Sequence, residues 1–221
     1  LQGPARDDPA MLARLTGMIA DNAARLEALV NDLLDLSRLK SGETPAVLEE
    51  VDLERALGRY REQFEAVCRR RRLTIEIDLG PGLGTVRTDP VLLDLIVRNL
   101  VENATKFARE GTPVVLWARA AEVPPDPVNP APAGADLATG LRIEVRDEGL
   151  GIPLSQQQRI FERFYQVDRA RAGGSAQRGT GLGLAIVKHA ARRLGGSVTV
   201  RSVYQQGTTM IVELPGCVGP G

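Results

Sequence analysis

The stretch RGTGLGLAIVKHAARRL, Arg178 to Leu194, decides how the rest of the sequence can fold. Three glycines at alternate positions, Gly179, Gly181 and Gly183, lead directly into a segment with the apolar spacing of a helix. Such a helix start offers free backbone N–H groups and a positive dipole end to a phosphate. The spacing is GxGxG instead of the GxGxxG of a dinucleotide site, and no strand pattern precedes it. The stretch therefore predicts a phosphate-binding loop outside a Rossmann unit.

A second polar cluster, NLVENATKF at Asn99 to Phe107, lies inside an otherwise apolar helix that is predicted to begin at Asp89. Asn99, Asn103 and Lys106 fall at helical offsets, so they share one face, with Phe107 beside them. An amide oxygen can ligate Mg²⁺, and an ammonium group can neutralise a phosphate. A solvated helix face would show the same pattern, so this cluster alone leaves both interpretations open.

A third cluster, RDEGLGIP at Arg146 to Pro153, directly follows a predicted strand. Asp147 stands at the strand end, and Gly149 and Gly151 follow it. A carboxylate there can accept a hydrogen bond from an exocyclic amine, and glycine lets the backbone approach a ligand closely. Asp-x-Gly also forms ordinary turns, so the pattern alone does not exclude a simple turn.

Residues 9 to 40 read as one helix, with Asp7 and Asp8 as its N-cap and Ser41-Gly42 as its stop. At 1.5 Å per residue this helix would be about 48 Å long, which is too long for it to stand alone. Apolar residues recur along it at spacings of three and four. We expect it to pack in a helical bundle or coiled coil, the alternative being a helix buried on its own domain.

The remaining segments predict an α+β fold. Strands are expected at 46–49, 73–79, 114–120, 141–146, 197–202 and 208–214, and helices from Asp52 to about Arg70, from Asp89 to about Ala108 and after Gly183. The proline-rich stretch Pro124 to Gly140 predicts a loop, and the run Arg69 to Arg72 reads as a helix end more readily than as a contact for nucleic acid or acidic lipid. Strands mixed with helices without strict alternation indicate a two-layer α/β sandwich with a mixed sheet and helices on one face, preceded by the long helix.

The amino-acid composition argues against several classes of protein. The chain carries 28 basic and 28 acidic residues, so it cannot grip nucleic acid by bulk positive charge. Its 2 cysteines make a disulfide scaffold unexpected, and its 1 histidine excludes a His-rich metal centre. No apolar run approaches the ~20 residues that cross a bilayer, and no signal peptide opens the sequence. Because the sequence begins at Leu1 and not at Met, we expect a processed product or an excised fragment.

Along the chain the three clusters stand in a specific order: NLVENATKF, then RDEGLGIP, then the glycine-led stretch, with IFERFY (Ile160 to Tyr165) between the last two. This order closely resembles the nucleotide-binding domain of bacterial sensor histidine kinases, members of the ATP-binding family shared with gyrase, the Hsp90 chaperones and MutL. The resemblance assigns residues 44–215 to the catalytic ATP-binding domain. It assigns residues 1–43 to a partial dimerisation and phosphotransfer hairpin, because LEALVNDLLDLSRLKSGE (Leu26 to Glu43) is similar to the second helix of that hairpin.

The resemblance implies a site for ATP and Mg²⁺. It implies that Asn103 holds the Mg²⁺ that bridges the ATP phosphates, that Lys106 lies near them, and that Asp147 accepts the adenine amino group. Asn103 and Lys106 would be the catalytic pair. The other nucleotide-binding positions that it implies are Asn99, Phe107, Gly149, Gly151, Ile152, Tyr165, Arg178, Gly179, Thr180, Gly181, Leu182 and Gly183. Residues 168–178 would form a lid over the nucleotide.

One position departs from the family pattern. The family often has an arginine near the γ-phosphate where this sequence has Gln166. Arg169, Arg171 or Arg178 could substitute for that arginine. The departure leaves open a nucleotide-binding scaffold without kinase activity.

The same resemblance implies the activity and its setting. ATP-hydrolysing relatives usually carry a glutamate base four residues before the metal-binding asparagine, and here that position is Asn99, which cannot take a proton from water. We therefore expect transfer of the γ-phosphoryl group to a protein histidine, with an ATPase or a serine kinase on the same fold as alternatives. His189, the single histidine, lies in VKHAARR, far from any acceptor motif, so it reads as a surface or packing residue and the acceptor is expected outside this chain.

The resemblance also implies the partners and the location. It implies a response regulator as the partner in two-component signalling and a homodimer formed through the helical bundle. No contact with nucleic acid is expected. The chain would be the cytoplasmic portion of a membrane-anchored sensor, in contact with the membrane only through segments absent here.

Overall fold

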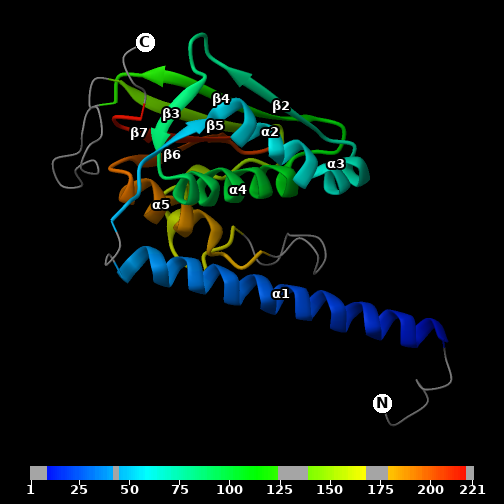
Figure 1. The fold of residues 1–221 in the computed structure, drawn as a ribbon. Coiled ribbons are helices and arrows are strands. Elements are labelled where there is room, and N and C mark those ends of the chain that lie inside the picture. The colour runs from blue at the N-terminus through cyan, green and yellow to red at the C-terminus, as the bar shows by residue number, and fades with distance from the viewer. Residues whose placement is uncertain (1–8, 42–44, 124–138, 168–178, 218–221) are drawn as a thin grey trace.

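The structure is a computed structural model that describes residues 9–41, 45–123, 139–167 and 179–217 (Figure 1). Its helices are α1 (Pro9–Ser41), α2 (Leu53–Gln63), α3 (Glu65–Arg71), α4 (Pro90–Phe107) and α5 (Gly183–Arg193), with short 3₁₀ helices η2 (Leu154–Gln156) and η3 (Arg159–Phe161). Its strands are β1 (Glu49–Asp52), β2 (Thr74–Leu79), β3 (Thr85–Thr88), β4 (Pro113–Ala121), β5 (Gly140–Asp147), β6 (Ser197–Val203) and β7 (Gly207–Leu214). Most of the loop predicted at Pro124 to Gly140 lies outside the described residues.

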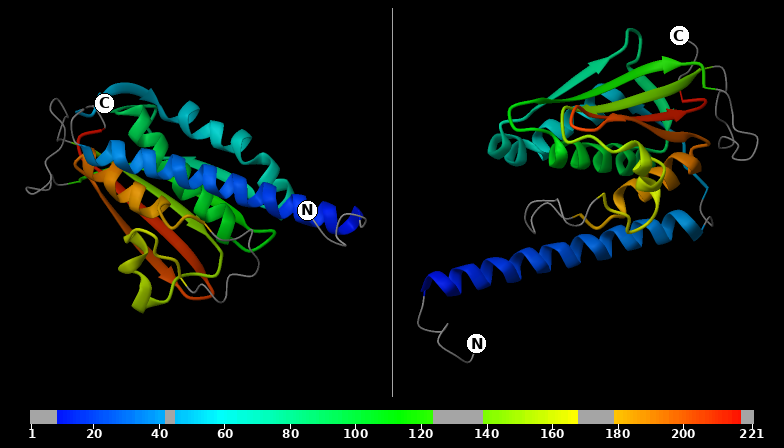
Figure 2. Two further views of the ribbon diagram at one scale, coloured as in Figure 1. Left: turned by 90° about the horizontal axis from the view of Figure 1, so that it is seen from below. Right: turned by 180° about the vertical axis from the view of Figure 1, so that it is seen from behind.

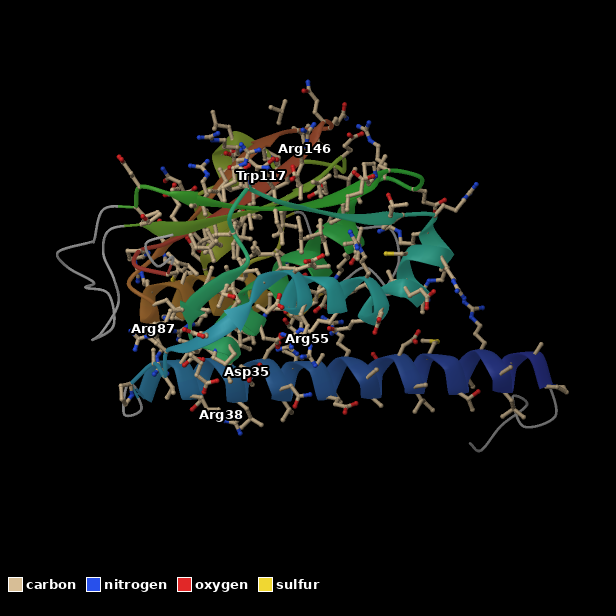
Figure 3. The ribbon with its side chains drawn as sticks, turned by 45° about the horizontal axis from the view of Figure 1, so that its top comes forward. Asp35, Arg38, Arg55, Arg87, Trp117 and Arg146 are labelled. Atoms are coloured by element: carbon tan, nitrogen blue, oxygen red, sulfur yellow. The ribbon has the colours of Figure 1, made fainter. Side chains whose placement is uncertain are left out.

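One mixed sheet forms the first layer of the fold. Its strand order is β2-β4-β5-β7-β6, with β2 and β4 parallel and the other pairs antiparallel. Along β4, Val114, Leu116 and Ala118 are fully buried, whereas Trp117 between them is only half-buried, because alternate side chains point to opposite faces. Figure 1 shows α2, α4 and α5 on one side of the sheet, and Figure 3 shows Trp117 and Arg146 on the other. The predicted two-layer α/β sandwich with helices on one face is confirmed.

The helices α4 and α5 form the second layer. Their apolar faces are buried against the sheet, as Ile96 and Leu100 of α4 and Ile186 of α5 show. The carboxylate of Asp89 accepts hydrogen bonds from two backbone N–H groups of the first turn of α4, and Pro90 occupies the first helical position, as the Asp-Pro pair predicts. The burial of one helix face fixes the direction of the opposite, polar face.

The long helix α1 lies beneath the helical layer, as the two views of Figure 2 show. Its C-terminal half packs against α5, and Leu36 and Leu39 are buried there. By contrast, Met18 is 54% exposed, and Ile19 and Leu26 are each 64% exposed. The predicted helix is confirmed, and only its C-terminal half packs on its own domain, so the bundle stays a prediction. The predicted caps at residues 7, 8 and 42 lie outside the described residues.

Two secondary-structure predictions are wrong. The strand expected at 46–49 lies at β1, three residues later, because Val51 pairs with Val86 of β3, a strand that the sequence did not reveal. The single helix expected from Asp52 to Arg70 is divided at Phe64, which leaves the helical conformation with φ −99° and ψ 7°. Both differences arise because side chains are buried against residues distant in sequence: Val86 and Phe64 both belong to the common core.

The arginine run ends α3, as predicted. Arg69, Arg70 and Arg71 occupy its last turn, and Arg72 follows in the left-handed conformation with φ 55° and ψ 33°. Positive charges there complement the negative end of the helix dipole. Among the described helices, none has both the length and the apolar character to span a membrane.

Candidate functional site

The polar face of α4 meets the start of α5. Asn99 is 7% exposed, and its side-chain N–H donates to the Leu95 carbonyl at 2.7 Å. A Cβ atom at Gly183 would lie 2.8 Å from the Asn99 Oδ1 atom and 3.8 Å from the Asn103 Nδ2 atom. Glycine at position 183 therefore allows α5 to begin directly against the two amides. The structure thus brings together the NLVENATKF cluster and the glycine-led helix that the sequence singles out.

Lys106, in the last turn of α4, faces the glycine-rich segment, which is residues 179–183. A Cβ atom at Gly179 would lie only 2.9 Å from the Lys106 Nζ atom. Burial lowers the pKa of Lys106; the carboxylate of Glu102 acts in the opposite direction, and Arg25 of α1 adds to the lowering. The ammonium group lies 5.6 Å from the centroid of the Phe107 ring, which is 42% exposed. A nearby anion stabilises the charged form of a partly desolvated cation of this kind.

Asp147 lies at the end of β5 as a buried carboxylate, 8% exposed. Its Oδ1 atom accepts a hydrogen bond from the Gly149 N–H at 2.8 Å. Burial raises the pKa of Asp147 to about 6, although backbone hydrogen bonds from Gly149 and Thr208 act to lower it. A carboxylate has about four acceptor positions, so this group can still accept a hydrogen bond from a ligand amine.

The two glycines after Asp147 are required by the protein's own backbone. A Cβ atom at Gly149 would lie 2.2 Å from the Phe107 carbonyl oxygen, and one at Gly151, where φ is +63°, would lie 2.1 Å from the Val203 carbonyl oxygen. The close backbone approach that these glycines predict is therefore made within the fold. The half-buried Ile152 follows them, and its N–H donates to the Ser202 hydroxyl at 2.8 Å.

Residues 164 to 166 hold the glycine-rich segment in place. Gly181 adopts φ +75°, and its carbonyl accepts a hydrogen bond from the Phe164 N–H at 2.8 Å. The side-chain amide of Gln166 donates to the Gly179 carbonyl at 2.6 Å. The sequence identifies Gln166 only as a departure from the family pattern, and the structure gives it a contact with the first glycine of the loop.

Thr180 connects this loop to α1. Its hydroxyl donates to the Asp32 Oδ2 atom at 2.5 Å and accepts a hydrogen bond from the Leu182 N–H at 3.1 Å. The Leu182 side chain is fully buried, so only its backbone faces the loop. Within the described residues, no side chain caps the first turn of α5, and its N–H groups remain available to an anion. Asp32 was not predicted as a site residue, because only a contact distant in sequence brings it here.

The remaining predicted residues lie at the edge of the site or outside the description. Tyr165 is half-buried, with the guanidinium carbon of Arg159 4.5 Å from its ring centroid. His189 is half-buried on α5, 3.3 Å from the Arg163 Nη2 atom, in agreement with a packing role. Arg178, Arg169, Arg171 and the rest of the predicted lid at 168–178 lie outside the described residues.

The arrangement offers complementary groups to one kind of ligand. A buried carboxylate can accept an amine at one end, and a lysine, two amides and a helix start can hold an anion at the other. Among the described residues, no group of three or more His, Cys, Asp or Glu side chains could hold a metal ion by itself. A separate hollow of 610 Å³ lies between α2, α3 and β2, and none of the predicted site residues lines it.

Comparison with known proteins agrees with this arrangement. Residues 88–217 match the family described as "Histidine kinase-, DNA gyrase B-, and HSP90-like ATPase". The chain is 32% identical over 209 residues to the sensor-like histidine kinase SenX3 of Mycolicibacterium smegmatis, covering 95% of this chain and 50% of that protein. It is 32% identical over 203 residues to the alginate biosynthesis sensor protein KinB of Pseudomonas aeruginosa, covering 92% of this chain and 30% of that one.

A solved structure of a known protein is also similar to this chain. The full-length ShkA structure in complex with AMPPNP has a TM-score of 0.72 and 28% identity, covering 97% of this chain and 40% of ShkA. The chain spans half or less of the length of these relatives, 50% of SenX3 and 30% of KinB. The matched residues 88–217 contain the site helix α4, the carboxylate of Asp147 and the glycine-led α5. The chain therefore belongs to the histidine kinase-, DNA gyrase B- and HSP90-like ATPase family, and its relatives include the sensor-like histidine kinase SenX3 and the sensor protein KinB.

Proposed function

We propose that this chain is the ATP-binding catalytic core of a sensor histidine kinase. The observation that carries the proposal is the position of Lys106 and Asn103 on α4, directly opposite the uncapped start of α5 and its glycine-rich segment. This places a cation, an amide and free backbone N–H groups where a polyphosphate would lie. The buried Asp147 supports the same proposal, since it would accept the amino group of adenine.

Magnesium fits the donor set as a companion of the nucleotide. The Asn103 side chain supplies a hard amide oxygen from a half-buried position, and Mg²⁺ is commonly held by few protein ligands together with substrate phosphates and water. When bound, the ion would neutralise negative charge on the phosphates. Lys106 would hold the phosphate chain, and the backbone of residues 179–183 would orient it.

The reaction proposed is phosphoryl transfer to a histidine outside residues 1–221. The bond between the γ-phosphorus and the bridging oxygen breaks and its electron pair leaves with ADP, a bond from the γ-phosphorus to an imidazole nitrogen forms, and the imidazole N–H proton is released to solvent. Hydrolysis is disfavoured because Asn99 cannot act as a base, and its amide donates to the Leu95 carbonyl. The chain then contributes position and electrostatics more than proton transfer.

The proposal extends to the organisation of the whole protein. Residues 1–43 would be part of the dimerisation and phosphotransfer hairpin, and residues 44–215 the catalytic domain. The exposed apolar residues of α1, such as Ile19 and Leu26, support a homodimer formed through a helical bundle. A solved structure of histidine kinase ThkA is a complex with the response regulator TrrA, and we infer a response regulator as the partner here also. The chain would be the cytoplasmic part of a membrane-anchored sensor.

A binding titration tests the nucleotide site. Fluorescence of trinitrophenyl-ATP with Mg²⁺ is followed for the wild type, Asn103→Ala and Asp147→Asn, with unfolding curves to verify that each variant is folded. We expect binding by the wild type and a loss of about tenfold in each variant, because each would lose a charge-assisted or metal contact. Unchanged affinity in both variants would contradict the assignment.

A phosphorylation assay tests the reaction. The full-length protein is incubated with γ-labelled ATP, and the product is treated with acid and with base. We expect an acid-labile, base-stable phosphoprotein, as a phosphohistidine would give. An acid-stable phosphoprotein would indicate a serine kinase. Release of free phosphate without labelled protein would indicate an ATPase, and nucleotide binding without either product a scaffold.

A further inference from the structure

One arginine of the run Arg69 to Arg72 holds the end of the site helix. The Nη1 atom of Arg71 donates to the Thr105 carbonyl at 2.5 Å and to the Lys106 carbonyl at 2.6 Å. Its Nη2 atom donates to the Ala108 carbonyl at 2.7 Å. The guanidinium of α3 therefore binds three carbonyl groups at the C-terminal end of α4. From the sequence, this run is predicted only to end its own helix. The contact with α4 was not predicted.

These bonds meet a specific need of α4. The last four carbonyl groups of a helix have no partner within the helix, and they form the negative end of its dipole. A guanidinium group presents several N–H donors in a rigid fork, so it can satisfy more than one carbonyl at once. The backbone of Arg71 adds to the contact, since its carbonyl accepts a hydrogen bond from the Gly111 N–H at 3.3 Å. The segment after α4 is thus also connected to Arg71.

The carbonyl groups that Arg71 binds lie in the turn that carries the proposed phosphate-binding residue. Lys106 belongs to this turn and faces Gly179. Phe107 follows it, and its carbonyl oxygen lies against Gly149. A shift of this turn would move the ammonium group relative to the glycine-rich segment and the backbone relative to Gly149. Errors of about 1 Å in such placement can weaken a site strongly.

We propose that Arg71 is a positioning residue of the nucleotide site, which acts by fixing the last turn of α4 and with it the Lys106 ammonium group. The inference rests on the proposed nucleotide binding. Arg71 does not need to touch the nucleotide, because its contacts are to the backbone of α4. Its neighbours in the run make different contacts: Arg69 pairs with Glu65 within α3, and Arg72 pairs with Glu110 at the surface.

The test compares Arg71→Ala and Arg71→Lys with Arg69→Ala. The control removes the same charge from the same helix turn, at a side chain that is 79% exposed. Affinity for trinitrophenyl-ATP with Mg²⁺ is measured well below the unfolding temperature of every variant. We expect Arg71→Ala to weaken binding about tenfold and Arg69→Ala less than about twofold. Arg71→Lys should lie between them, because an ammonium keeps the charge but lacks the rigid fork.

A double-mutant cycle with Lys106→Ala separates positioning from general stability. If Arg71 acts through the turn that carries Lys106, then Arg71→Ala should change affinity by less than about twofold in the Lys106→Ala background. The same tenfold loss in both backgrounds would overturn the inference. A lowered unfolding temperature with wild-type affinity would also overturn it, since Arg71 would then be only structural. Failure of the wild type to bind nucleotide would overturn the proposed function and this inference with it.

Discussion

Asp32 and Thr180, 148 residues apart in the sequence, share a hydrogen bond of 2.5 Å that joins the long helix α1 to the glycine-rich segment. Burial raises the pKa of Asp32, while the hydrogen bond from Thr180 and the charge of Arg98 lower it and Asp35 adds to the rise. Asp35 itself pairs with Arg98 of α4 at 3.3 Å. A carboxylate thus stands beside the helix start that we assign to the phosphates of ATP.

Asp32→Asn should therefore tighten nucleotide binding. The amide can still accept the hydrogen bond from Thr180, but the negative charge near the phosphates is removed. Removing one like charge at a few ångströms from a partly exposed site is worth roughly 1 kcal/mol. We expect a fall in Kd of about fivefold, measured by titration with Mg²⁺ and trinitrophenyl-ATP.

Asp21→Asn is the matched control for Asp32→Asn. It neutralises the same type of residue on α1, about 16 Å along the helix from Asp32. Its Kd should stay within about twofold of the wild type because exposed charges at this separation are screened. Equal effects of the two substitutions would indicate a general charge effect and contradict a specific role for Asp32.

Asp147→Asn should change how stability depends on pH. The pKa of Asp147 is raised from 3.8 to about 6 in the folded protein. The folded state therefore binds the proton more tightly than the unfolded state, and ionisation of this group lowers stability as pH rises from 3.8 to about 6. The wild type carries this cost above that window, whereas the amide does not ionise.

The predicted quantity is the difference in unfolding free energy between Asp147→Asn and the wild type. The unfolding free energy of the variant, relative to that of the wild type, should rise by about 1 kcal/mol between roughly pH 5 and pH 8. Urea unfolding at a series of pH values measures it, and taking the difference cancels the other titrating groups. A difference that is independent of pH would show that the pKa of Asp147 is not raised. The same variant is expected to lose nucleotide affinity, so a gain in stability would accompany a loss of function.

Two glycine-to-alanine substitutions should have effects of opposite sign. At Gly149 an added Cβ atom would lie 2.2 Å from the Phe107 carbonyl oxygen, which belongs to the backbone and cannot move away easily. At Gly58, in the middle of α2, no atom lies within 4 Å of an added Cβ atom. Gly149→Ala should lower the unfolding free energy by about 3 kcal/mol. Gly58→Ala should raise it by roughly 0.5–1 kcal/mol, because alanine favours the helix.

Chemical unfolding of both glycine variants checks the pair. A small effect of Gly149→Ala would mean that the contact of this turn with the end of α4 is loose. That result would also weaken the inference about Arg71, which fixes the same end of α4.

The sequence predicts well the parts of the fold that depend on local patterns. The Asp89 cap, the amphipathic α4 and the glycine-led α5 are predicted within a residue or two, because caps and periodicity are local signals. The break at Phe64 and the pairing of β1 with β3 are missed because both depend on burial against distant residues.

The residues of the candidate site also divide into those that local motifs predict and those that only distant contacts bring to the site. Asn103, Lys106, Asp147 and the glycines can be selected from motifs, and the structure brings Lys106 to Gly179 and Asn103 to Gly183. The contacts of Asp32 with Thr180 and of Arg71 with the end of α4 have no sequence signature, since an acid on a helix and an arginine in a basic run are common. Nor could the sequence show that Gly149 and Gly151 are required by backbone contacts inside the fold.

Arg72→Gly should stabilise the protein. Arg72 has φ 55° and ψ 33° directly after α3, a left-handed conformation that glycine adopts without steric cost. Relief of that strain exceeds the extra backbone entropy that glycine gives the unfolded chain, so we expect a gain of about 0.5–1 kcal/mol in unfolding free energy. The pair with Glu110 is a small loss, because the two side chains are 80% and 59% exposed. Arg72→Ala is the control: it loses the same charge but keeps the strain, so urea unfolding should show no gain. If both variants gain equally, relief of charge repulsion in the arginine run, and not backbone strain, is the cause.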